Sequence, residues 1–199
     1  FSTIDALSSG RAEITAGRGS FIESFPLFGY DLNDYSILFE EKLQLLVELL
    51  KENAVSWSGT TRPALVNQEV YPKSHSGKIP LRVGVGGTPE SVVRTARIGA
   101  HLALAIIGGD PARFAPFAHL YRNACAELKT AVLPISIHSP GHIAKTDEQA
   151  REEYFPHYQA MHSRIGAERG WGPLSKEQYI HEIEYGSLSV SYTHLRAHE

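Results

Sequence analysis

Short apolar runs alternate with amphipathic segments along most of this chain. Four runs are read as buried β-strands, over residues 11–16, 80–85, 102–107 and 132–138. Between them, apolar residues recur at the three- and four-residue spacing of helices that bury one face. Buried strands that alternate with helices are typical of a parallel sheet covered by helices. The pattern therefore predicts an α/β fold, and periodicity alone leaves open whether the sheet is open or closed into a barrel.

The predicted helices begin at residues that commonly cap helices. The expected N-caps are Asn33 or Asp34, Thr88, Thr146 and Ser175. Side chains of these types accept hydrogen bonds from the free N–H groups of a first turn. The helix after Asp34 places four apolar residues on one face, namely Phe39, Leu43, Leu46 and Leu50. Residues 55–59 alternate like a short strand, and a polar loop is expected from there to about residue 78.

Composition excludes several classes of protein. The 199 residues carry 19 Lys and Arg against 22 Asp and Glu, a net charge of −3. This balance argues against a general nucleic-acid surface, which needs a basic excess. The single cysteine, Cys125, excludes an internal disulfide framework and a thiolate zinc cluster, and it reads as a small core residue. No apolar run reaches the ~18 residues of a membrane span and no signal peptide is visible, so we expect a cytoplasmic protein.

The segment VGVGGTPES, residues 83–91, is the sharpest candidate for a ligand site. Gly86 and Gly87 follow a strand and let the backbone approach a ligand closely. The helix that starts after Thr88 offers free N–H groups and a partial positive charge, and Thr88 and Ser91 add hydroxyl donors. This arrangement suits a phosphate monoester. A capped helix after a tight turn would explain the same residues, and the segment matches neither a Walker loop nor the dinucleotide-binding glycine pattern.

Arg18 is the second candidate, because it lies between Gly17 and Gly19 at the end of the first predicted strand. The carboxyl ends of parallel strands border the ligand crevice in α/β folds. A guanidinium group there can form charge-assisted hydrogen bonds with phosphate. A surface arginine in a salt bridge is the simpler interpretation of Arg18 alone. Taken together, Arg18 and residues 86–91 outline one phosphate site.

Two other regions contain residues of possible chemical interest. The end of the third predicted strand, Ile106 to Gly108, would make a flat floor for a ring system, or would simply be sheet core. His138 and His142 are four residues apart, but an intervening Pro-Gly pair excludes helical metal-ligand geometry and no third ligand is near. No metal site is therefore expected. His157 and His162 are expected to face solvent.

Three stretches resemble the luciferase-like flavin monooxygenases, the bacterial luciferase family of FMN-dependent (β/α)8 barrels. They are IDALSSGRAEITAGRGSFIESFPLFGYDL, PLRVGVGGTPESVVRTARIG and LALAIIGGDPARFAPFAHLYRNA. The resemblance extends over residues 1–188 and implies a partial TIM barrel, approximately strands four to seven with their helices. Residues 189–199 look like a translated cloning adapter and are expected to be a non-native tail; a native polar tail is the alternative.

The resemblance also implies roles for individual residues. Arg18 matches the family arginine that binds the FMN phosphate from the end of the fourth barrel strand. Gly87, Thr88 and Ser91, with Gly86 beside them, match the phosphate loop after the fifth strand. The sixth-strand end that borders the isoalloxazine ring corresponds to Ile106, Ile107 and Gly108. His138 and Ser139 would lie at the end of the seventh strand, on the substrate side. The resemblance assigns no catalytic residue.

The activity that the resemblance implies is oxygenation of a small organic substrate with reduced FMN and O₂. Reduced flavin would come from a separate reductase or be formed in place from NAD(P)H, and the intact protein would pair as a homodimer. Strands one to three would precede Phe1 and the eighth would follow Leu188, so we expect this chain alone to fold poorly and to be inactive.

Three other functions remain open. The first is a family member that binds flavin without catalysis. The second is a dehydrogenase relative that uses the deazaflavin F420, whose more negative tail would prefer a more basic pocket mouth than the sequence shows. The third is an unrelated phosphate-binding barrel, such as a sugar-phosphate enzyme.

Overall fold

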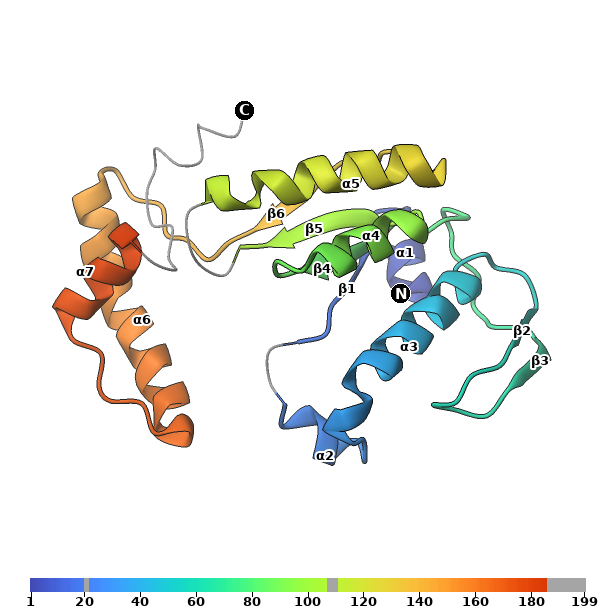
Figure 1. Ribbon diagram of the computed structural model, residues 1–199, viewed down its shortest axis with the longest axis horizontal. Helices are drawn as coiled ribbons and strands as arrows, with labels where there is room; N and C mark the ends of the chain where they lie inside the picture. The colour runs from blue at the N-terminus through green and yellow to red at the C-terminus, as the bar shows by residue number, and fades with distance from the viewer. Residues whose placement is uncertain (20–21, 107–110, 186–199) are drawn as a thin grey trace. The chain divides into compact units, whose positions relative to one another are not determined.

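Four strands form one sheet in the order β1-β4-β5-β6 (Figure 1). They are β1 (Ile14–Ala16), β4 (Leu81–Val85), β5 (His101–Ala105) and β6 (Ser136–His138), and they overlap the four predicted strands. β1 and β4 are parallel, with Ile14 opposite Leu81. The computed structural model describes residues 1–19, 22–106 and 111–185. The prediction of an α/β fold with a parallel sheet is confirmed, and the partial barrel stays a prediction.

The described chain divides into two compact units. Unit 1 contains residues 1–103 and 120–136, and unit 2 contains residues 104–119 and those from 137 onward. Strands β1 and β4 and the first residues of β5 belong to unit 1, where Val83, Val92 and Leu102 are among the most deeply buried side chains. The candidate phosphate residues, Arg18 and 86–91, all belong to unit 1.

Burial along the strands follows their order in the sheet. The buried residues of β5 are consecutive, namely Leu102, Ala103 and Leu104, as expected for a strand covered on both faces. β4 buries every second residue, namely Leu81, Val83 and Val85. β6 is an edge strand, and its Ile137 is 49% exposed. The expectation that all four strands are buried on both faces is therefore wrong for the two edge strands, β6 and β1, because an edge strand has a neighbouring strand on one side only; Thr15 of β1 is also exposed.

Helix α3 (Tyr35–Leu49) starts after Asp34, as predicted, although the Asp34 side chain makes no capping hydrogen bond. The predicted core face is only partly correct. The buried residues of α3 are Leu38, Leu43 and Leu45, whereas the other three predicted positions, Phe39, Leu46 and Leu50, are half-buried. The helix is apolar on more than one side, so the spacing of its apolar residues did not determine which side enters the core.

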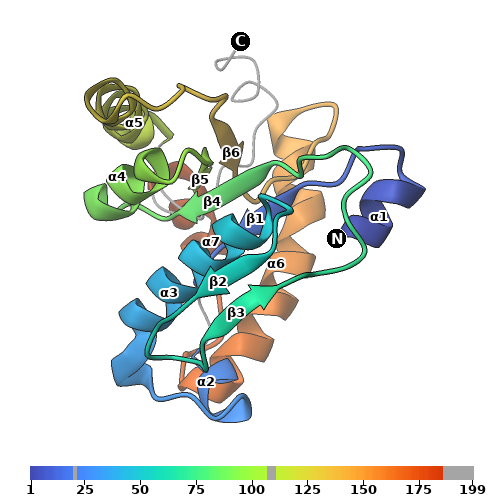
Figure 2. The ribbon, with the colours of Figure 1, turned by 90° about the vertical axis from the view of Figure 1, so that its right-hand side faces the viewer.

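The polar segment after residue 57 contains a strand that the sequence pattern did not predict. β2 (Val55–Trp57) pairs antiparallel with β3 (Leu65–Gln68) in a two-stranded sheet (Figure 2). In β3 the first residue, Leu65, is half-buried and the other three are exposed. Because β3 has no apolar face, hydrophobic alternation could not reveal it, and the expectation of one continuous loop is wrong there.

The remaining helices that lie wholly in unit 1 are short, whereas α5 begins in unit 2 and ends in unit 1. They are α1 (Ser2–Leu7), α2 (Ser24–Leu27), the 3₁₀ helix η1 (Leu32–Asp34) and α4 (Pro89–Arg97). Helix α5 (Ala115–Leu128) follows the 3₁₀ helix η2 (Pro111–Phe114). The Tyr121 hydroxyl of α5 donates a hydrogen bond to the Ala100 carbonyl at 2.8 Å, just before β5. Cys125, one turn further, is completely buried, as predicted.

Unit 2 is built mainly on two helices, α6 (Asp147–Arg169) and α7 (Lys176–Tyr185). Both predicted caps are confirmed: Thr146 Oγ1 accepts from Gln149 N at 3.1 Å, and Ser175 Oγ accepts from Gln178 N at 3.2 Å. The core of this unit consists of Ala150, Leu174 and Tyr179. Within the described residues, no helix has the length and apolar character needed to cross a membrane.

His162 corrects another expectation. Its ring packs against Trp171, with centroids 5.2 Å apart, and its Nδ1 is buried without a hydrogen-bond partner. It borders a hollow of about 640 Å³ beside α7. The prediction that His162 faces solvent is therefore wrong, because the chain turns after α6 and brings Trp171 back over the ring.

Candidate anion-binding site

The loop between β4 and α4 contains an exposed glycine, Gly86, followed by a glycine with a positive φ angle, Gly87. Gly86 is exposed, and within the described chain no heavy atom other than those of Gly86 and its two sequence neighbours lies within 4 Å of the position that a Cβ would take there. Gly87 has φ = +124°, a region that side-chain-bearing residues rarely adopt. Thr88 occupies the N-cap position and Pro89 the first turn of α4, as predicted. This loop therefore leaves open space directly before a helix N-terminus.

The Thr88 side chain does not cap the helix but bonds to another hydroxyl. Thr88 Oγ1 and Ser91 Oγ are 2.7 Å apart, and no backbone N–H of α4 donates to Thr88 Oγ1. Ser91 Oγ also lies 3.3 Å from a terminal nitrogen of Arg94. The two predicted hydroxyl donors thus form one pair, rather than serving as separate groups.

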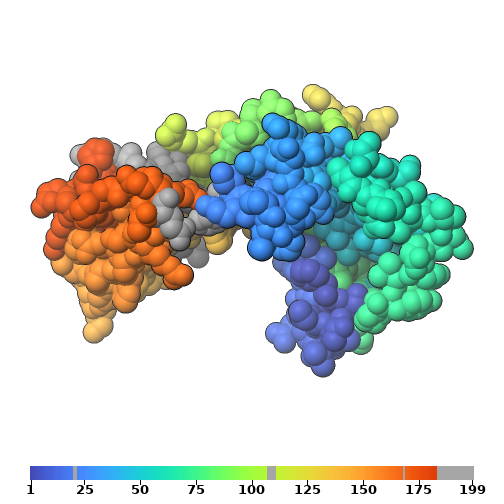
Figure 3. Space-filling view, turned by 90° about the horizontal axis from the view of Figure 1, so that it is seen from below, coloured from blue at the N-terminus to red at the C-terminus, as the bar shows by residue number. Residues whose placement is uncertain are grey.

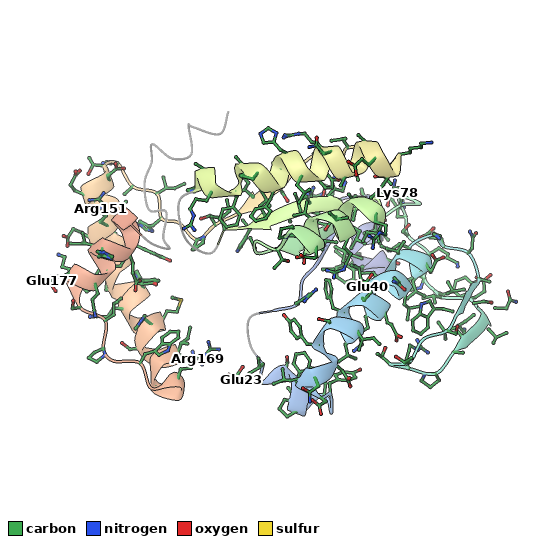
Figure 4. All side chains as sticks on the ribbon, viewed as in Figure 1. Glu23, Glu40, Lys78, Arg151, Arg169 and Glu177 are labelled. Carbon is green, nitrogen blue, oxygen red and sulfur yellow. The ribbon has the colours of Figure 1, made fainter. Side chains whose placement is uncertain are left out.

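Arg94 is fixed by a carboxylate on another helix. Its Nε donates to Glu40 Oε2, which lies 54 residues earlier in the chain. Glu40 is labelled on α3 in Figure 4. The two side chains are only 16% and 34% exposed. A partly buried ion pair of this kind is screened less than a surface one. It fixes the Arg94 guanidinium between α3 and the β4–α4 loop.

Arg18 lies on aromatic rings of α3. Its guanidinium carbon is 5.0 Å from the centre of the Phe39 ring and 5.2 Å from that of Tyr35, distances typical of cation–π contacts. Among the described residues, no carboxylate pairs with Arg18. The simpler salt-bridge interpretation of Arg18 thus lacks a partner in the described part of the chain.

A cavity of about 510 Å³ lies beside Arg18. Residues of β1, α2 and α3 line it, including Arg18, Phe25, Tyr35, Phe39 and Lys42. The two helices that border it, α2 and α3, reach the surface of the molecule (blue in Figure 3). None of residues 86–91 is among the described residues that line this cavity.

Phe39 connects Arg18 to the loop. The guanidinium carbon of Arg94 is 5.8 Å from the centre of the Phe39 ring, against 5.0 Å for that of Arg18. Arg94 in turn contacts Ser91. The structure therefore brings Arg18 and the β4–α4 loop to the same aromatic ring, although they are about 70 residues apart in the sequence.

The other predicted site residues belong to unit 2. The Ile106 N–H donates to the His138 carbonyl at 2.8 Å, so the ends of β5 and β6 lie side by side. The Ile106 side chain is 1% exposed, whereas His138 and Ser139 are exposed. Ile107 and Gly108 lie outside the described residues, as do residues 189–199. Within the described part, no three His, Cys, Asp or Glu side chains gather as a metal site would need.

The sequence model of the family "Luciferase-like monooxygenase" matches residues 1–197. The chain belongs to this family. No curated protein matches this luciferase-like chain significantly.

Solved structures show the same fold at low identity. The monooxygenase RslO1 from Streptomyces bottropensis is 21% identical, with a TM-score of 0.66, over 96% of this chain and 63% of that one. An FMN complex of the oxygenating constituent of 3,6-diketocamphane monooxygenase, a type II Baeyer-Villiger enzyme from Pseudomonas putida, is 12% identical, with a TM-score of 0.63, over 90% and 58%.

A third neighbour uses another cofactor. An F420-dependent secondary alcohol dehydrogenase, in complex with an F420-acetone adduct, is 14% identical, with a TM-score of 0.66, over 96% of this chain and 60% of that one. This luciferase-like chain therefore spans less than two thirds of the length of each of these three proteins. The shared fold includes both FMN- and F420-associated proteins.

Sequence reasoning missed Phe39, Glu40 and Arg94 as parts of the site. Arg94 follows Ser91 by three residues on a helix, so their side chains share a face, and this spacing was a usable signal. The pairing of Glu40 with Arg94 gave no such signal, because it joins helices that are distant in the sequence. Phe39 was assigned to the core as an apolar helix residue, whereas it is a half-buried platform for two guanidinium groups.

Proposed function

We propose that this luciferase-like chain binds the phosphate of FMN and belongs to a flavin-dependent oxidoreductase that oxygenates a small organic substrate. The observation that carries the proposal is the arrangement around Phe39. Arg18, which has no carboxylate partner in the described chain, and Arg94, which contacts Ser91, both lie over this ring. Because arginine and hydroxyl donors are the groups that bind phosphate oxygens, their common position favours one anion site.

The residues present fit a phosphate group. Arg18 offers a planar guanidinium that can donate two parallel hydrogen bonds. The space next to Gly86 allows an oxygen to approach the backbone. The N-terminus of α4 adds a partial positive charge, which favours an anion by about 0.3–1 kcal/mol. The Thr88–Ser91 pair supplies a further donor.

The remaining assignments are also proposals. Ile106, with Ile107 and Gly108, would border the flavin ring and exclude water from it, while His138 and Ser139 would face the substrate. When bound, reduced FMN would supply the electrons for the activation of O₂. A separate reductase or NAD(P)H would provide the reduced flavin, and the intact protein would act as a homodimer.

A binding experiment tests this function directly. The chain is titrated with FMN, riboflavin and F420, and binding is followed by flavin fluorescence. We expect FMN to bind more tightly than riboflavin, which lacks the phosphate, and inorganic phosphate to compete with FMN. Equal affinity for FMN and riboflavin would overturn the phosphate site, and clearly tighter binding of F420 would replace FMN with the deazaflavin. Because the chain alone is expected to fold poorly, a circular dichroism spectrum recorded on the same sample shows whether it is folded.

A further inference from the structure

The side chains of Glu40, Arg94 and Ser91 form a continuous chain of polar contacts that no sequence motif indicated. Glu40 pairs with the Nε of Arg94, and a terminal nitrogen of Arg94 lies 3.3 Å from Ser91 Oγ. Ser91 in turn pairs with Thr88 at 2.7 Å. This series of side-chain contacts thus extends from the middle of α3 to the first residues of α4.

When the donors and acceptors of these contacts are counted, one hydroxyl proton of the Thr88–Ser91 pair has no acceptor among them. A guanidinium only donates, so Ser91 Oγ must be the acceptor from Arg94. The two hydroxyls, Thr88 and Ser91, carry one proton each, and the bond between them uses only one of the two. Whichever hydroxyl donates in that bond, the other hydroxyl retains a proton that it can donate elsewhere. Because Arg94 occupies an acceptor position of Ser91, it limits the rotation of this pair.

The ion pair with Glu40 explains why Arg94 can orient the hydroxyls instead of attracting the anion itself. Glu40 compensates the charge of Arg94 locally, whereas the charge of Arg18 has no carboxylate partner in the described chain. Arg18 would therefore attract the anion, and Arg94 would act through the hydroxyls. Fixing a donor before the ligand arrives reduces the ordering cost of binding.

We propose that Arg94, held by Glu40, is a positioning residue that orients the Thr88–Ser91 hydroxyl pair toward the ligand phosphate. This inference rests on the proposed function, because it assigns the phosphate to the β4–α4 loop. Glu40 and Arg94 do not touch the ligand in this proposal. They determine how well the site distinguishes a phosphate-bearing ligand from the same ligand without phosphate.

The test compares FMN with riboflavin in Glu40→Gln, Arg94→Gln and the control Arg97→Gln. Arg97 is exposed on the same helix and serves as a matched loss of one positive charge. We expect the first two substitutions to lower the FMN-to-riboflavin preference by about threefold to tenfold, the effect of one hydrogen bond. Riboflavin affinity and the Arg97→Gln protein should be unchanged. If Glu40→Gln increases FMN affinity, Glu40 only repels the anion and the proposal is wrong.

A double-mutant cycle separates positioning from general damage to the fold. In a Ser91→Ala background, Glu40→Gln should no longer change the FMN preference, because its effect passes through Ser91. Additive effects of the two substitutions would overturn the positioning role, and this comparison holds even if Arg94→Gln does not fold. If the unaltered protein binds FMN and riboflavin equally, the proposed function itself fails. If it prefers FMN and the Glu40 and Arg94 variants retain that preference, only the positioning role fails.

Discussion

Gly86 and Gly87 are neighbours in the β4–α4 loop, yet only Gly87 has a backbone conformation that requires glycine. Gly87 has φ = +124°, whereas Gly86 lies outside the positive-φ region and has open space around its Cβ position. The first glycine therefore leaves room for a ligand, and the second allows the chain to turn into α4. Substitutions of these two neighbouring residues should therefore have different effects, on ligand binding for Gly86 and on folding stability for Gly87.

Gly86→Ala is expected to weaken FMN binding without changing stability. The added methyl meets no heavy atom of the described chain within 4 Å beyond its two sequence neighbours, so it would occupy the space proposed for the phosphate. Gly87→Ala is expected to destabilise the protein by about 1–3 kcal/mol, because a side chain strains the backbone at this φ. Thermal melts and FMN titrations of both variants check the pair. Unchanged FMN affinity in a folded Gly86→Ala protein would exclude the phosphate from this loop.

Arg18→Ala is expected to weaken FMN binding by about 1.5–3 kcal/mol, the contribution of a hydrogen bond to a charged group. Arg18→Lys should recover only part of this loss, since an ammonium group lacks the bidentate geometry of guanidinium. Calorimetric titration with FMN and riboflavin measures both variants. Arg122→Ala, on the exposed side of α5, is the matched control. An FMN affinity that does not change in Arg18→Ala would remove Arg18 from the site.

The sequence allowed the four strands and most helix starts to be predicted, because these depend on local patterns. Thr146 and Ser175 cap their helices as expected. The core face of α3 and the strand β3 escaped prediction, since α3 is apolar on several sides and β3 is largely exposed. In both cases the outcome depends on which distant segment packs against the element.

In the candidate site, too, the residue types could be predicted from the sequence, whereas their arrangement could not. The residue types at Arg18, Thr88 and Ser91 indicated anion chemistry. Their arrangement around Phe39 depends on α3, whose contacts with Arg18 and Arg94 are tertiary. The hydroxyl of Thr88 was expected to cap α4, and it bonds to Ser91 instead. Local rules identify donors, but the partner of each donor is decided by the fold.

Glu41→Gln is expected to make the stability of the protein less dependent on pH in acid. The backbone N–H of Thr60, together with the hydroxyl and N–H of Thr61, lowers the pKa of Glu41 from 4.5 to about 2. Since the folded state favours the ionised carboxyl, this stabilisation is complete above pH 4.5 and is lost as the pH falls toward 2. Gln cannot be ionised, so the variant should be less stable than the unaltered protein at neutral pH.

Chemical denaturation at a series of pH values measures this effect. The difference between the two proteins should shrink as the pH falls from 4.5 toward 2. Glu48→Gln is the control on the same helix, because Glu48 forms an exposed ion pair with Lys51 and such pairs contribute little. A difference that stays constant over this range would show that the Glu41 carboxyl is not ionised preferentially in the folded state.

Tyr121→Phe is expected to destabilise unit 1 by about 1–3 kcal/mol. The Tyr121 side chain is completely buried, and its hydroxyl donates to the Ala100 carbonyl at 2.8 Å. Burial raises the pKa of Tyr121 to about 12, so the hydroxyl stays protonated as a donor at ordinary pH. Phe keeps the ring but leaves the buried carbonyl without this partner, and an unsatisfied buried acceptor carries that cost.

Thermal melts measure this effect. For a chain of this length, each kcal/mol of lost unfolding free energy lowers the melting temperature by about 2–4 °C. Tyr30→Phe, which removes a hydroxyl at an exposed position, should leave the melting temperature unchanged. If both variants melt at the temperature of the unaltered protein, the Tyr121 hydrogen bond does not anchor α5 to the start of β5.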